Sequence, residues 1–251
     1  MKSFSVIFLM TVLFSGSAQA RVFDLKAANF GTYFGGTIGS SQLSKQPWGD
    51  SSGPSTTTDT PVRLNYSGEF GFLMAIPKIN LRFGVEYLQP QKLSDIKGKN
   101  PSDQLDFTLN SNTRAIIPKV SVEFVVWKTN DSAFIFGGSA GYAMITMENQ
   151  YAMTAQGTTD FGVGDYNEKA SGNAIGAEGF IGYEFVFSDN VTLFTNLGYR
   201  YLLVNELKHQ NSATTIAGAV AKDSTVINQD GKNRSLDMSA AQAAIQFRFY
   251  F

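Results

Sequence analysis

The chain has 251 residues and a formal net charge of −1, and only 16% of its residues are charged, against about 25% in typical soluble domains. A charge near zero excludes the basic stripe that nucleic-acid binding requires, and the absence of cysteine excludes disulfides and thiolate metal sites. Aromatic residues make up 13% and 24 residues are glycine, a composition that favours a β-rich membrane protein.

The first 20 residues have the features of an export signal. Lys2 supplies a positive charge, and the apolar run over residues 4–14 is too short to anchor the chain in a membrane. Ala18 and Ala20 form the small-x-small pattern of a signal peptidase site. We therefore expect residues 1–20 to be a signal peptide and residues 21–251 to be one exported domain.

From residue 30 onwards, apolar and polar residues alternate at period two in segments of roughly ten residues, as in β-strands with two different faces. Over residues 79–87, apolar side chains occupy the odd positions, and Asn80, Arg82 and Glu86 lie on the other face. Eight strands are expected, over residues 30–38, 64–72, 79–87, 116–126, 134–144, 175–187, 191–203 and 245–251.

The connections between these segments alternate in length. Short turns are expected at residues 76–78, 128–132 and 188–190, and long polar connections at residues 41–61, 89–112, 149–173 and 205–233. Short turns on one side and long loops on the other are typical of outer-membrane barrels, with the loops outside the cell. The sequence leaves open whether the long connections continue as strands.

Alternation alone also fits a soluble β-sandwich or a lipocalin-like barrel, whose apolar face points inward. Three features favour the membrane. Large aromatics lie at strand ends, as an interfacial girdle requires. The polar faces carry Gly, Ala and Ser with few charges, and Phe247, Phe249 and Phe251 alternate at the carboxy terminus. We therefore predict an all-β fold, an eight-stranded antiparallel up-and-down transmembrane β-barrel in the bacterial outer membrane.

The aromatic terminus Phe247, Phe249 and Phe251 resembles the signature that the outer-membrane assembly machinery reads. Together with the leader and the loop pattern, it makes the chain resemble the small eight-stranded family of the OmpA transmembrane domain and OmpX. The resemblance is architectural and covers nearly all of the exported domain. It implies outer-membrane lipid, lipopolysaccharide and the barrel assembly machinery as partners, whereas the partner of the loops is not identified.

The inward faces carry nine charged residues, five acidic and four basic. They are Glu69, Arg82, Glu86, Lys119, Glu123, Glu178, Glu184, Arg200 and Arg248. The lumen of an eight-stranded barrel is just wide enough for side chains, and buried charges are costly unless they are paired. A tight turn at residues 188–190 places Glu178 opposite Arg200, which suggests that the two pair, and Glu69 falls near Glu86. Two interpretations follow: a salt-bridged plug, as the OmpA resemblance implies, or a gated ion path in which the pairs exchange partners.

The predicted loops offer weaker candidates for a site. His209 is the only histidine, and no hydrolase pattern surrounds it, so we expect a solvated loop residue. The acidic residues of the third loop do not have the spacing of a calcium loop, so we expect a hydrated segment over Asp160, Asp165 and Glu168.

Aromatic residues of the first and third loops, Trp48, Phe161 and Tyr166, allow either an external apolar surface or mutual packing above the barrel mouth. From these features we expect no catalytic, cofactor-binding or metal site, and no enzymatic activity. The leading prediction is a barrel with a structural or surface-interaction role carried by its extracellular loops. The alternatives are a narrow porin-like channel for ions or small solutes, a lateral route for apolar ones, and, last, a surface enzyme.

Overall fold

The computed structural model describes residues 24–25, 30–40, 43, 55–57, 64–227 and 232–251. The predicted leader with Ala18 and Ala20, and most of the first long connection with Trp48, lie outside these ranges. Expectations about those segments therefore remain predictions.

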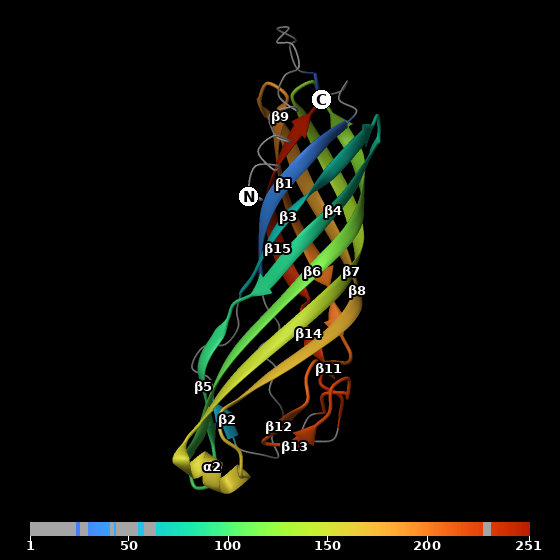
Figure 1. The fold of residues 1–251 in the computed structure, drawn as a ribbon. Helices are drawn as coiled ribbons and strands as arrows, with labels where there is room; N and C mark the ends of the chain where they lie inside the picture. Colours follow the sequence, from blue (N-terminus) through green and yellow to red (C-terminus); the bar gives the residue numbers. More distant parts are fainter. Residues whose placement is uncertain (1–23, 26–29, 41–42, 44–54, 58–63, 228–231) are drawn as a thin grey trace, which may run out of the picture.

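Eight strands form a closed antiparallel ring, which confirms the predicted fold class (Figure 1). Every strand pairs with its neighbour along the chain, and the last strand pairs with the first, so the sheet has no free edge within the ring. The ring consists of β1 (Phe30–Ser40), β3 (Leu64–Ile76), β4 (Ile79–Pro90), β6 (Leu105–Lys128), β7 (Ser132–Met153), β8 (Tyr166–Ser188), β9 (Val191–Tyr201) and β15 (Ala240–Tyr250).

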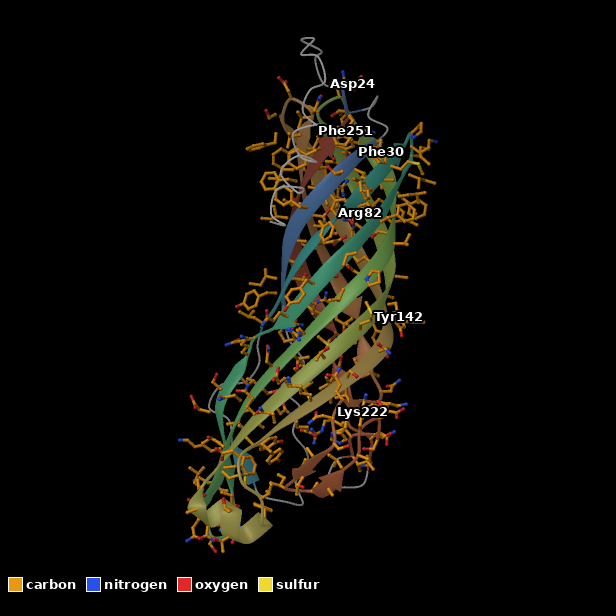
Figure 2. The ribbon with its side chains drawn as sticks, viewed as in Figure 1. Asp24, Phe30, Arg82, Tyr142, Lys222 and Phe251 are labelled. Atoms are coloured by element: carbon orange, nitrogen blue, oxygen red, sulfur yellow. The ribbon has the colours of Figure 1, made fainter. Side chains whose placement is uncertain are left out.

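The three predicted short turns lie at one end of the barrel. They join β3 to β4, β6 to β7 and β8 to β9, and Asn190 in the last of them adopts the left-handed conformation with φ of 61°. The chain termini of the ring meet at the same end, where the Phe251 amide donates to the Phe30 carbonyl at 3.0 Å. Figure 2 shows Asp24, Phe30 and Phe251 together there. This end is the periplasmic one.

Two of the four predicted long loops are mostly strand. β6 and β7 stay paired from the periplasmic turn as far as Phe107 and Met153, and β8 follows β7 to Tyr166. The seven-residue helix α2 (Ala155–Phe161) joins β7 to β8 at the far tip. Short strands complete this extracellular part: β2 (Ser55–Thr57), β5 (Leu93–Lys99), β10 (Leu203–Val204), β11 (Lys208–His209), β12 (Ala213–Thr215), β13 (Gly218–Val220) and β14 (Leu236–Asp237).

The polarity of the strands inverts where they leave the membrane. In the periplasmic half of β6 the outward residues are apolar and exposed, among them Ile116, Val120 and Phe124, and the inward ones are polar, among them Ser121 and Glu123. Between residue 115 and the extracellular tip the pattern reverses. The outward residues there are Thr108, Asn110, Asn112 and Arg114, and the inward ones include Phe107, Leu109 and Ala115. A strand must turn apolar side chains to lipid inside the membrane and to its own core in water. The predicted strands over residues 116–126, 134–144 and 175–187 are therefore too short, because the lipid-facing alternation covers only their membrane part.

The outer face of the periplasmic half exposes many large apolar side chains. Phe34, Phe70 and Phe187 are 53%, 66% and 63% exposed, and the Phe34 ring stacks on those of Phe247 and Phe249 at 5.5 and 5.7 Å. Soluble monomers rarely expose a continuous apolar surface of this extent. The soluble barrel is therefore the wrong alternative, and the protein is an outer-membrane β-barrel. The one described helix is neither long nor apolar enough to cross a membrane.

The barrel wall at Gly84 has no room for a side chain. A Cβ there would lie 2.2 Å from the Tyr33 hydroxyl oxygen and 2.9 Å from the Phe70 carbonyl oxygen. Gly84→Ala should therefore displace Tyr33 and destabilise the barrel by about 1–3 kcal/mol, as overpacking does. Urea unfolding in micelles measures the loss. Gly179→Ala is the matched control, since a Cβ there meets no atom within 4 Å, and an equal loss in both variants would contradict this interpretation.

Candidate functional site

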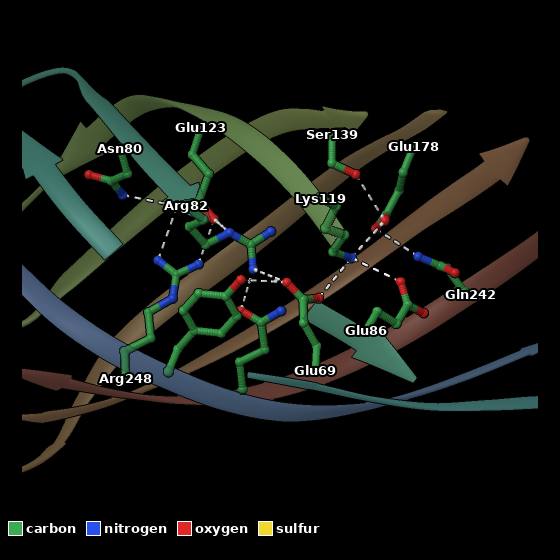
Figure 3. Close-up of polar contacts among 12 residues, drawn as sticks. Glu69, Asn80, Arg82, Glu86, Lys119, Glu123, Ser139, Glu178, Gln242 and Arg248 are labelled. Atoms are coloured by element: carbon green, nitrogen blue, oxygen red, sulfur yellow. Dashed lines mark hydrogen bonds and ion pairs between the residues drawn. The ribbon is translucent and has the colours of Figure 1, made fainter. Parts of the chain in front are cut away.

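The structure brings all nine charged residues of the inward faces together inside the barrel. None of their side chains is more than 9% exposed. Ion pairs join them into one network, part of which Figure 3 shows. From the periplasmic side outward, it runs through Glu184, Arg248, Glu123, Arg82, Glu69, Lys119, Glu86 and Arg200, with Glu178 attached to Lys119.

The periplasmic part of the network is built around Arg248 of β15. Its guanidinium pairs with Glu123 of β6, with an Nη2 to Oε1 distance of 2.6 Å, and with Glu184 of β8, with an Nη1 to Oε2 distance of 2.8 Å. The same guanidinium lies 3.9 Å above the Phe194 ring. The Tyr250 hydroxyl donates to Glu184 at 2.6 Å. Each charge here is thus both paired and hydrogen-bonded, the condition under which buried ions are tolerated.

The centre of the network joins five strands, β1, β3, β4, β6 and β15. Arg82 Nε lies 2.8 Å from Glu123 Oε1, and Arg82 Nη1 donates to Gln246 Oε1 at 2.7 Å. The Tyr33 hydroxyl donates to Glu69 Oε1 at 2.6 Å. Tyr33 and Gln246 are hydrogen-bonding members of the network, and the pattern of charged residues alone does not identify them. Their inward position in the alternation was the signal that could have found them.

The outer part of the network converges on Lys119 of β6. Its ammonium group lies 2.7 Å from Glu69, 3.2 Å from Glu86 and 3.4 Å from Glu178. Arg200 of β9 pairs with Glu86, with an Nη1 to Oε1 distance of 2.6 Å. Lys119 therefore forms ion pairs with three of the five carboxylates.

The predicted register is correct, but one inferred pair is wrong. Glu178 lies opposite Arg200, and Glu69 lies opposite Glu86, as expected from the turns. Arg200 nevertheless reaches across the lumen to Glu86, while Glu178 is held by Lys119 and by Gln242, which donates at 2.7 Å. In so narrow a barrel, long side chains reach strands on the far side, so register partners need not be ionic partners.

Two apolar layers enclose the charge network. On the periplasmic side, Leu25 is 1% exposed and packs into a cluster with Leu73, Ala75, Ile135, Phe194 and others. On the extracellular side a larger cluster includes Leu88, Ile96, Leu109, Ile117, Ile145, Met147, Leu202 and Val204. Beside Glu86 and Lys119 the free space is about 20 Å³, room for about one water. The described lumen is therefore a filled core.

A second polar cluster lies outside the membrane, and it corrects two expectations. His209 is 5% exposed, so the prediction of a solvated loop residue is wrong. It is buried because β11 pairs with β8, His209 lying opposite Ala170. Glu168 also faces inward: it accepts from Asn149 at 3.1 Å and pairs with Arg234 at 3.4 Å. Glu168 is therefore not part of a hydrated acidic loop.

Among the other residues named for the third loop are two exposed acids, Asp160 and Asp165, and Tyr166. Asp165 accepts from the Met153 amide at 2.7 Å, and Asp160 accepts from Gln156 and Asn100 at the α2 tip. No cluster of three or more metal-ligating acids or histidines occurs among the described residues. Tyr166 turns inward, where its ring stacks on that of Tyr151 at 4.4 Å. It therefore contributes to the interior of the extracellular part, and Trp48 lies outside the described ranges.

The second cluster lines a cavity of about 350 Å³ between β8 and the chain that follows β11. Burial lowers the pKa of His209 below its usual range, and Arg234 adds to this while Glu168 opposes it. His209 is therefore a neutral imidazole at pH 7. Burial and the nearby Glu168 raise the pKa of Tyr151, so its hydroxyl keeps its proton. These groups can bind a polar molecule, and the cavity has the space for one.

Known proteins resemble this chain only distantly in the comparisons made at the level of sequence and structure. No protein-family model and no curated protein matches the sequence. Among solved structures, the chain is similar to the outer membrane protein OprG from Pseudomonas aeruginosa, with 16% identity, 92% of this chain and 99% of that one covered, and a TM-score of 0.46. A major outer membrane protein from Thermus thermophilus has 12% identity, coverage of 89% and 100%, and a TM-score of 0.48. Ail of Yersinia pestis has 8% identity, coverage of 89% and 99%, and a TM-score of 0.40. Likenesses at this level of identity and TM-score carry no inference, so the function has to be sought in this chain's own residues.

Replacing Arg248 should strongly destabilise the barrel. Arg248→Met leaves Glu184 buried without its ion pair and removes one of the two arginines of Glu123, which we expect to cost about 3–5 kcal/mol. Arg248→Met combined with Glu184→Gln should recover part of the loss. Arg200→Ala should cost less, because Glu86 keeps Lys119 at 3.2 Å. Urea unfolding of the folded barrel in micelles gives the ranking, and a larger loss for Arg200→Ala would contradict it.

The stability of the extracellular part should fall in mild acid. The pKa of His209 is lowered in the folded state, so the unfolded segment binds the proton more tightly, and stability decreases as pH falls below about 6.5 towards the folded value. Hydrogen exchange of residues 208–226, corrected for the intrinsic rate, should therefore show weaker protection at acidic than at neutral pH. His209→Gln should remove this difference, and its persistence in the variant would assign it to another group.

Proposed function

We propose that the protein is a non-conducting outer-membrane barrel whose extracellular part serves a surface-interaction role. The observation that carries this proposal is the contrast between a filled lumen and a large ordered structure outside the membrane. The network and its two apolar layers leave little free space in the described lumen, whereas the strands continue well beyond the apolar belt.

The lengths of the strands support an external role. β6, β7 and β8 have 24, 22 and 23 residues, and about 9–11 residues are enough to cross the bilayer. Roughly half of each strand therefore stands outside the membrane, hydrogen-bonded to its neighbours and closed by α2 (Figure 1). A rigid platform of this kind suits recognition, since it loses little conformational entropy on binding.

A lateral route for apolar solutes is the second candidate, and a specific hollow favours it. Beyond Tyr201 the chain leaves its pairing with β8, and a space of about 590 Å³ opens between residues 171–175 and residues 201–208. The adjacent side chains of Leu202, Val204 and Leu207 are all 0% exposed and belong to the extracellular apolar cluster. A route here requires these side chains to move, so it ranks below the surface role.

The proposed function predicts a silent barrel. Wild-type protein, shown to be folded by heat-modifiable gel migration, should give no steady openings in planar bilayers, because the lumen is filled. A variant in which residues 154–165 are replaced by a two-residue turn should fold and remain silent, but lose adhesion of its proteoliposomes to cell surfaces. A known porin in the same bilayer is the positive control. Reproducible openings of the wild type would overturn the proposal in favour of a channel.

A further inference from the structure

The extracellular cavity has the composition of a binding site. It is lined on one side by Glu168, His209 and Arg234, which are 7%, 5% and 7% exposed. The rest of the lining combines small apolar residues of the β12–β13 hairpin, among them Ala219 and Val220, with polar residues such as Thr215 and Ser224. Convergent polar groups beside an apolar wall are a common feature of small-molecule sites.

The charges of the cavity favour an uncharged ligand. Glu168 and Arg234 pair at 3.4 Å and so neutralise each other, and His209 is held neutral by its burial. A ligand with a net charge would meet no unpaired counter-charge among the described lining residues, and its desolvation would be costly. A neutral ligand avoids that cost.

The polar atoms favour hydroxyl groups. A carboxylate only accepts hydrogen bonds and a guanidinium only donates them, while a hydroxyl does both. Adjacent hydroxyls can therefore donate to Glu168 and accept from Arg234 at once. The imidazole of His209, whose Nδ1 lies 3.9 Å from Glu168 Oε1, supplies a further partner next to them.

The size and the apolar wall favour a single ring. The cavity of about 350 Å³ lies near the lower end of the range for ligand pockets, about 300–1,000 Å³. The C–H face of a sugar ring can pack against Val220 and its alanine neighbours while its hydroxyls face the charged pair. A long apolar chain would cover the charged pair with a surface that itself offers no hydrogen bonds.

We propose that this cavity binds one ring of a neutral sugar, with Glu168 and Arg234 as its hydrogen-bonding pair. The inference rests on the proposed surface-interaction role and names the chemistry of its ligand. The same chemistry has two possible sources, a sugar dissolved outside the cell and a ring of the lipopolysaccharide core in the same membrane.

The test uses the full-length protein in lipid nanodiscs and saturation-transfer NMR. The probes are glucose, galactose and N-acetylglucosamine at millimolar concentrations, a phosphate-free core oligosaccharide released from lipopolysaccharide, and glycine betaine as a zwitterion without hydroxyls. Glu168→Gln removes the acceptor charge, and Val220→Trp fills the cavity while both members of the polar pair stay unsubstituted. The matched controls are Glu148→Gln, an outward carboxylate on β7 that pairs with Lys169, and Thr214→Trp, an exposed position on β12 outside the lining.

Sugar signals in the wild type and in both controls, weakened about tenfold or more in both cavity variants, support the proposal. Binding of free monosaccharides assigns the soluble source, and binding of the core oligosaccharide alone assigns the membrane source. Three results overturn it: no sugar binding in the wild type, binding of betaine in place of sugar, or unchanged sugar binding in Val220→Trp. A silent barrel that adheres but binds no sugar refutes this inference alone, whereas a conducting barrel refutes the proposed function.

Discussion

The pairing of nine buried charges is the constraint on which the membrane part of this barrel depends. In lipid every backbone group must find a partner, so the sheet closes and its apolar side chains turn outward. The polar side chains are then forced into a lumen that is only as wide as the side chains themselves. Ions in such a space persist only where they are paired. Lys119 and Arg248 meet this condition because each one joins carboxylates that come from different strands.

The same constraint ends where the membrane ends, and this explains the shape of the molecule. Outside the bilayer, water solvates the outward faces, and the inside of the sheet becomes an ordinary apolar core. Ile117 lies next to Lys119 on the inward face of β6, so the change from core to charge network happens within one step of the alternation. The extracellular half is thus folded by burial of apolar residues, and the membrane half by closure and charge pairing. The two halves share three continuous strands.

The strand alternation and the turns were enough to predict the ring of strands, the nine inward-facing charged residues and the register of Glu178 against Arg200. They were not enough to predict which charges pair, because Arg200 reaches Glu86 across the lumen, a contact that depends on the closed geometry. The burial of His209 depends on the pairing of β11 with β8, and the local sequence after residue 205 has no alternation that would predict this strand. Leu25 likewise closes the periplasmic end through a long-range contact, its amide donating to the Asn130 carbonyl.

The two polar clusters use the same residue types and differ in the space around them. In the lumen, Glu86 and Arg200 lie at 2.6 Å, in contact with a void of about 20 Å³. Outside the membrane, Glu168 and Arg234 lie at 3.4 Å and face about 350 Å³. A close ion pair without free volume beside it leaves no space for a ligand to form a hydrogen bond. A more widely spaced ion pair at a cavity wall can form hydrogen bonds with a ligand in the cavity. Free volume, more than the presence of charge, therefore separates the part of this barrel that holds the fold from the part that we propose as a binding site.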